Sequence, residues 1–173
     1  MKTFLCAGLL LASAAPCLAA GPFDAPSPLP FHAPQFDKIK DSDYMPAFLA
    51  GMKEQRAEID AIAAGKDAPT FQNTVVAMER SGRMLDRVSE TFFNIQQANT
   101  DPAIDKVQND VAPLLAAHND AIYLNAKLFA RVKAVYDARA GLKLDPESLA
   151  LLNLYYRHYV PPTPIYLLHL NEN

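Results

Sequence analysis

The sequence is poor in the residues that most often carry catalysis. It has two cysteines, no tryptophan and only six glycines among 173 residues. Both cysteines, Cys6 and Cys17, lie within the first twenty residues. Without that segment the chain has no disulfide, no thiolate nucleophile and no cysteine metal ligand. The few glycines form no cluster, which excludes a glycine-rich loop of the kind that binds phosphate.

Motifs for metal-dependent and nucleophilic hydrolysis are also missing. No histidine is followed by glutamate and no two histidines are four residues apart, so there is no His-Glu-x-x-His zinc helix. Neither Gly-x-Ser-x-Gly nor Ser-x-x-Lys occurs. We interpret the four histidines as solvated or core-edge side chains: His32, His118, His158 and His169. The sequence therefore predicts no catalytic, cofactor-binding or metal-binding residue in this chain.

The charge pattern argues against nucleic acid as a partner. The net charge is −3, and no stripe of lysine and arginine runs along any segment. Binding to a phosphate backbone requires such a stripe.

Residues 1–19 have the pattern of a secretory signal peptide. Lys2 supplies the positive start, and an apolar run from Phe4 to Ala15 follows it. The small residues Cys17 and Ala19 occupy the two positions that favour cleavage after Ala19. The run is too short to span a bilayer, and no later stretch is long and apolar enough. We expect an exported protein, periplasmic or secreted, with no membrane partner after cleavage.

Residues 20–41 are rich in proline. Pro22, Pro26, Pro28, Pro30 and Pro34 alternate with apolar side chains. Proline fixes φ and removes a hydrogen-bond donor, so we predict an extended arm. Its apolar side chains indicate that it lies against the rest of the molecule.

Residues 42–160 have the apolar period of helices throughout, which predicts an all-α domain. The expected helices are Asp43–Ala64 with Ser42 as N-cap, a second with its apolar stripe from Phe71 to Ile95, a third starting at Asp101-Pro102, a fourth over 126–139 capped by Asn125, and a fifth starting at Asp145-Pro146. Gly82 lies inside the second, where we expect a neighbouring helix to approach closely. In the first, Leu49, Met52 and Ile59 mark the inward face. Short loops predict antiparallel neighbours.

The fifth helix ends in an aromatic cluster, Tyr155-Tyr156-Arg157-His158-Tyr159. Tyrosine and arginine are common anchors for ligands. Such a helix end also packs into a core with its hydroxyls at the rim. The sequence leaves both interpretations open.

Residues 161–173 differ from the rest. Pro161-Pro162 and Pro164 stop the fifth helix, and an unpatterned apolar run, Ile165–Leu170, follows. Exposed apolar runs of this kind favour aggregation. We interpret this tail as foreign to the domain, and our hypothesis is a shifted reading frame or an interrupted gene near Val160.

Several blocks resemble one enzyme family in the same order. They are Ala33–Lys40 with Asp43-Tyr44 and Pro46-Ala47, Pro69–Thr74 with Ala77–Glu79, Ala117–Asn125, Lys127–Phe129, Leu144–Ser148 and Tyr155–Arg157. Together these blocks resemble the N-terminal part of the thimet-oligopeptidase-like zinc metallopeptidases. The nearest branch is the peptidyl-dipeptidases, or dipeptidyl carboxypeptidases. The resemblance covers roughly residues 23–160.

The resemblance implies a large helical enzyme that cleaves short peptides in a deep channel. Its zinc is held by a His-Glu-x-x-His helix and a further glutamate, none of which lies in this chain. We therefore expect no cofactor here, although the intact enzyme carries zinc, and a helical fragment that shapes the substrate channel without catalysing alone. The alternative is a stand-alone, non-enzymatic binding module in the periplasm. An isolated fragment also exposes apolar surface, so we expect self-association.

Overall fold

The computed structural model describes residues 21–99 and 101–159, and all regular structure in this part of the chain is helical. The all-α expectation is therefore confirmed. The expected signal peptide (1–19) and the atypical tail (161–173), which includes His169, lie outside the described residues. The proposed division into an arm and a helical domain stays a prediction.

The proline-rich arm packs partly against the helices and is not uniformly extended. Two short 3-10 turns interrupt it, η1 (Pro30–His32) and η2 (Phe36–Lys38). The φ that proline imposes is compatible with a tight turn as well as with an extended chain, so composition alone did not separate the two. Phe23 inserts into the core at 3% exposure, with its ring centroid 5.7 Å from that of Tyr44. This burial holds the start of the arm in place.

Helix α1 (Asp41–Ala63) begins two residues earlier than the sequence suggested. The Asp43 carboxylate accepts a hydrogen bond from the Lys40 N–H at 2.9 Å, which satisfies a donor just before the first turn. Ser42 thus lies inside the helix and is not its N-cap. Leu49, expected on the inward face, is 49% exposed, whereas Met52 and Ile59 are buried.

The second expected helix is not continuous, and this prediction was wrong. Thr70 caps it as expected, because its Oγ1 accepts from the Asn73 N–H at 3.0 Å. A π-helical segment, η3 (Phe71–Val76), leads into α2 (Ala77–Glu79), and α3 (Arg83–Ala98) follows a break. Gly82 has φ 77 at this break, which ends the helical hydrogen-bond pattern. A Cβ on Gly82 would meet the Gln55 side chain of α1, so the expected close approach exists at the break.

The other helix starts follow their expected caps. The Asp101 carboxylate accepts from the Ala103 and Ile104 N–H groups and begins α4 (Pro102–Tyr123). The Asn125 side chain caps α5 (Ala126–Asp137) in the same way, and Asp145 accepts from the Ser148 N–H in α6 (Pro146–Tyr159). A short turn, η4 (Arg139–Gly141), follows α5, which ends two residues before the expected boundary.

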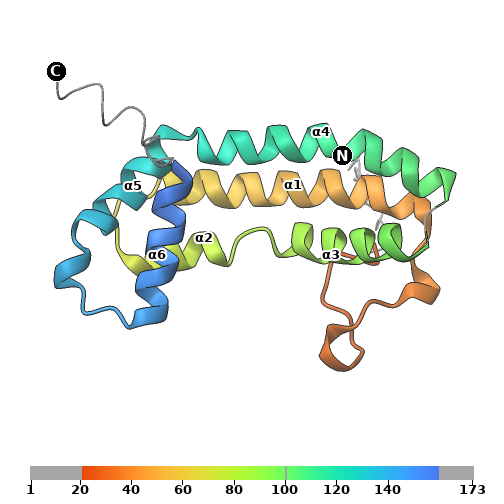
Figure 1. The fold of residues 1–173 in the computed structure, drawn as a ribbon, viewed down its shortest axis with the longest axis horizontal. Coiled ribbons are helices and arrows are strands. Elements are labelled where there is room, and N and C mark those ends of the chain that lie inside the picture. The colour runs from red at the N-terminus through yellow and green to blue at the C-terminus, as the bar shows by residue number, and fades with distance from the viewer. Residues whose placement is uncertain (1–20, 100, 160–173) are drawn as a thin grey trace, which may run out of the picture.

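The long helices form a layer that α5 and α6 close at one end (Figure 1). Helix α1 lies between α3 and α4 and contacts both. Helices α1 and α3 run antiparallel, as expected of neighbours, whereas α1 and α4 run in the same direction and α5 lies at an angle to α4 (Figure 1). One core cluster joins the arm to α1, α3 and α4, and includes Phe23, Phe48, Val88, Phe92 and Val111. Two further clusters pack α5 and α6 against η3, α2 and the end of α1.

Candidate functional site

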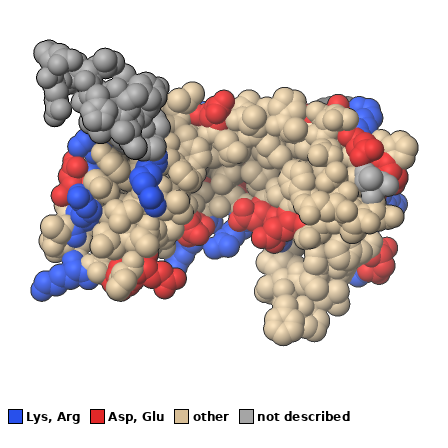
Figure 2. All heavy atoms as spheres, viewed as in Figure 1, with Lys and Arg blue, Asp and Glu red and all other residues tan. Residues whose placement is uncertain are grey.

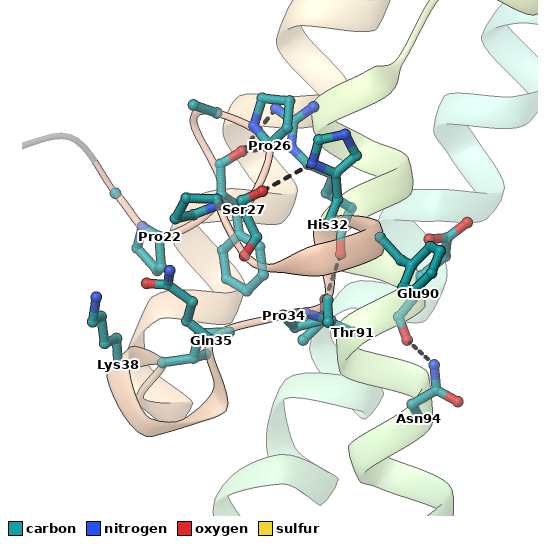
Figure 3. Close-up of a pocket in the computed structure, with 18 residues that line it drawn as sticks. Pro22, Pro26, Ser27, His32, Pro34, Gln35, Lys38, Glu90, Thr91 and Asn94 are labelled. Atoms are coloured by element: carbon teal, nitrogen blue, oxygen red, sulfur yellow. Dashed lines mark hydrogen bonds between the residues drawn. The ribbon is translucent and has the colours of Figure 1, made fainter.

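A cavity of about 550 Å³ lies between the proline-rich arm and α3. We call it the arm cavity. Apolar arm residues form one wall, and Arg87, Glu90, Thr91 and Asn94 of α3 form the other (Figure 3). Its size and its mixture of apolar walls with a few polar groups fit a small-ligand site. The arm itself projects from α3 as a lobe that carries little charge (Figure 2).

Arg87 fixes the arm to α3. Its Nε and Nη2 donate to the carbonyl oxygen of Phe23 at 3.0 and 2.8 Å, and Nη2 also reaches the Asp24 carbonyl at 3.3 Å. Hydrogen bonds from a charged donor are stronger than neutral ones. Together with the burial of Phe23, they hold the cavity open between two elements far apart in sequence. No pattern in the sequence pointed to this role for Arg87.

The rim of the arm cavity contains strained backbone. Phe31 and His32 have φ values of 57° and 56°, which residues other than glycine seldom adopt. The His32 Nδ1 lies 2.9 Å from the Ser27 carbonyl, and the His32 N–H donates to the Leu29 carbonyl at 3.0 Å. These bonds maintain the turn. They hold the Phe31 ring fully in solvent, at 102% exposure.

Three polar side chains that line or edge the arm cavity have no hydrogen-bond or ion-pair partner among the described residues. They are the Lys38 ammonium, the Gln35 amide and the Glu90 carboxylate. Lys38 and Glu90 lie on opposite sides of the cavity (Figure 3). The cavity thus has opposite charges at its two ends and an amide that can both donate and accept.

The aromatic end of α6 packs into the core. The Tyr136 and Tyr156 rings stack with centroids 3.7 Å apart, and Tyr159 packs against Tyr123 and Phe129 at 5.4 and 5.3 Å. The Tyr155 hydroxyl donates to Glu79 at 2.8 Å. Burial is the main cause that raises the pKa of Tyr155 well above its ordinary value, and the hydrogen bond to Glu79 raises it further. The arrangement follows the packing interpretation, because these rings pack against one another and against α4 and α5.

The described histidines do not converge on one site. His118 is buried on α4, and its Nε2 donates to Gln55 Oε1 at 2.7 Å. Burial lowers the pKa of His118, and the nearby Arg56 lowers it further. His158 is exposed on α6 with Nδ1 3.2 Å from the Tyr123 hydroxyl, and His32 lies in the arm. His118 therefore has the core-edge role that we expected of it.

Residues 21–99 and 101–159 contain no set of side chains that matches the ligands of a zinc site. This part of the chain brings together no group of three or more histidine, cysteine, aspartate or glutamate side chains that could hold a metal ion. No chemical step through a metal follows from these residues. Among them, too, no helix combines the length and apolarity needed to cross a bilayer.

The sequence is similar to dipeptidyl carboxypeptidases from two enterobacteria. It is 42% identical over 143 residues to the "Dipeptidyl carboxypeptidase" of Salmonella typhimurium, which is 83% of this chain and 21% of that protein. It is also 42% identical over 139 residues to the "Dipeptidyl carboxypeptidase" of Escherichia coli, which is 80% of this chain and 20% of that protein. The chain thus spans about a fifth of the length of these curated relatives. No family model matches it.

Proposed function

We propose that this chain is the N-terminal helical part of an exported zinc peptidyl-dipeptidase. Its sequence is peptidyl-dipeptidase-like and matches about a fifth of its relatives' length. In that role it shapes the channel that admits short peptides and does not catalyse alone. The zinc and its ligands belong to the remainder of such an enzyme. The observation that carries the proposal is 42% identity sustained over four fifths of the chain.

Exposed apolar side chains support the proposal that this chain packs against further protein. Several large apolar side chains stand in solvent on α1, α4 and α6 and in the loops beside them: Leu49, Leu114, Leu124, Leu142 and Leu154. Single exposed leucines are ordinary, but five in so small a body leave considerable apolar area uncovered. Additional chain from an intact peptidase would cover such area.

A hybrid enzyme tests the proposal. The 139 matched residues of the Escherichia coli relative are replaced by those of this chain. We expect the hybrid to bind zinc and to release dipeptides from a short peptide, because the transplanted helices pack as the native ones do. A hybrid that is folded and loaded with zinc but releases no dipeptide would contradict the proposal.

Two controls complete that experiment. The relative with the same residues deleted is expected to be inactive. This chain alone, supplied with zinc, is expected to release no dipeptide. Release by the chain alone would overturn its non-catalytic role. An inactive hybrid together with a monomeric, cooperatively melting chain would favour the stand-alone binding module instead. Export is checked on the chain recovered from the periplasm, whose first residue is expected to be Ala20.

A further inference from the structure

We propose that the arm cavity binds a short peptide with free termini, whose large apolar side chain packs against Phe31 at the rim. The peptide's amino group faces Glu90 and its carboxylate faces Lys38. The inference goes beyond the proposed function, because it concerns binding by this chain itself. It rests on three features of the described residues: the strain at Phe31, the charges at the two ends of the cavity and the chemistry of the walls.

Phe31 is the first feature. An aromatic ring in solvent contributes no hydrophobic stabilisation to the fold, and a positive φ at phenylalanine is unfavourable. Here the two occur together, and the hydrogen bond between His32 and Ser27 maintains the unfavourable conformation. Strained residues are retained where the surrounding structure over-determines them, often at ligand clamps. A ring held in solvent at the edge of a cavity is placed to close over an apolar group inside it.

The charges select the ligand. Glu90 and Lys38 lie at opposite sides of the cavity (Figure 3), and neither has an ion-pair partner among the described residues. A short peptide with free ends carries a cation and an anion separated by an uncharged backbone, which matches this arrangement. A simple anion or cation would satisfy only one end. Residues 25–36 of the arm contain no aspartate, glutamate, lysine or arginine, and His32 is their only titratable side chain.

The walls fit the middle of such a peptide. Pro26, Pro28 and Pro34 supply rigid apolar surface, and the arm loses little entropy on binding because proline already restricts it. The Gln35 amide also lines the cavity and can bond a peptide group, which presents one donor and one acceptor. On the α3 side, Asn94 uses one amide hydrogen on the Glu90 carbonyl at 2.7 Å and keeps its oxygen free to accept.

The chain has no tryptophan, which allows a direct binding assay. The probe is the tripeptide Ala-Trp-Ala with free termini, titrated with the purified chain while tryptophan emission is recorded. We expect the emission to move to shorter wavelength as the indole packs against Phe31. Acetylation of the amino end or amidation of the carboxyl end is each expected to weaken binding about two- to fivefold, the range of exposed charge pairs.

Variants assign each end of the peptide. In Glu90→Gln, acetylation is expected to cost no further affinity, and in Lys38→Gln, amidation is expected to cost none. Phe31→Asn is expected to weaken binding about tenfold, since it removes the aromatic contact. Asparagine tolerates the left-handed conformation, so the thermal midpoint stays the same or rises. Phe36→Asn is the matched control: Phe36 is an exposed aromatic side chain of the same arm that does not line the cavity, and binding is expected to be unchanged.

Three results would overturn the inference: no spectral shift, a folded Phe31→Asn chain that binds like the wild type, or blocked peptides that bind as well as the free one. Because these measurements use this chain alone, they are separate from the hybrid enzyme. Absent binding with an active hybrid removes the peptide site and leaves the proposed function intact. Binding with an inactive hybrid does the reverse.

Discussion

His118 is a buried titratable group whose ionisation is coupled to folding. Its imidazole is 9% exposed and bonds to Gln55, and burial lowers its pKa in the folded chain. The unfolded chain therefore takes up a proton at higher pH than the folded one does. The stability contributed by neutral His118 is complete above the ordinary histidine pKa of about 6.5 and is lost as the pH falls toward the lower folded pKa.

We therefore expect His118→Gln to flatten the pH dependence of stability. The measurement is the urea midpoint of unfolding at about pH 7.5 and about pH 5.5 in the wild type and the variant. The wild type is expected to lose more stability between these values. Glutamine can still bond to Gln55, so the variant should remain folded, and carboxylates common to both chains cancel in the comparison. Equal losses in the two chains would show that His118 is not linked to folding.

The described helices show which features could be predicted from sequence. Asp101, Asn125 and Asp145 begin helices where expected, because a capping side chain bonds to a backbone N–H two or three residues away. Such information is local. The break at Gly82 was missed because the apolar stripe continues across it in sequence, whereas the turn is held by a tertiary bond from the Gly82 N–H to Glu58 of α1, at 2.7 Å.

The arm cavity could not have been predicted in the same way. Proline content indicated an arm that packs on the molecule, and the burial of Phe23 agrees with that. The other wall comes from α3, and its anchor, Arg87, bonds to a carbonyl 64 residues earlier. The strain at Phe31 depends on a turn that composition does not specify. Tertiary contacts of this range leave no periodic signal in a single sequence.

The contact between α1 and α3 depends on Gly51. A Cβ at this position would lie 2.9 Å from the backbone N and Cα of Leu85, so the two helices must separate to admit it. We expect Gly51→Ala to destabilise the chain by about 1–3 kcal/mol, the usual cost of overpacking. Helix propensity alone would favour alanine, so the close approach decides the sign.

Gly141 provides the matched control for this prediction. A Cβ there meets no atom within 4 Å. Gly141→Ala is therefore expected to change the free energy of unfolding by less than about 1 kcal/mol, and in the stabilising direction if at all. Both variants are measured by urea denaturation. Similar effects at the two positions would mean that the helices adjust to the extra methyl group without cost.

At the scale of the whole molecule, α6 is held by fewer fully buried groups than the helices at the arm end. The arm end packs α1, α3 and α4 around several phenylalanines, including Phe48 and Phe92, whose ring centroids lie 5.4 Å apart. At the other end, α6 buries a single residue, Leu152, against Phe71, Val75 and Val135. An element with so few buried groups should open more easily than the rest.

Native-state hydrogen exchange tests this difference. We expect the slowest exchange in α1 and α3 and faster exchange in α6. Leu152→Ala removes a fully buried side chain, a change that costs about 2–5 kcal/mol in a protein core. Because Leu152 packs on η3 and α5, exchange should quicken in α6, η3 and α5, while α1 and α3 keep their protection.

Leu154→Ala, which alters a side chain 45% exposed on the same helix, should leave the pattern unchanged. Uniform acceleration after Leu152→Ala would instead show that the described helices unfold as one cooperative unit, with α6 as firmly held as the helices around Phe48.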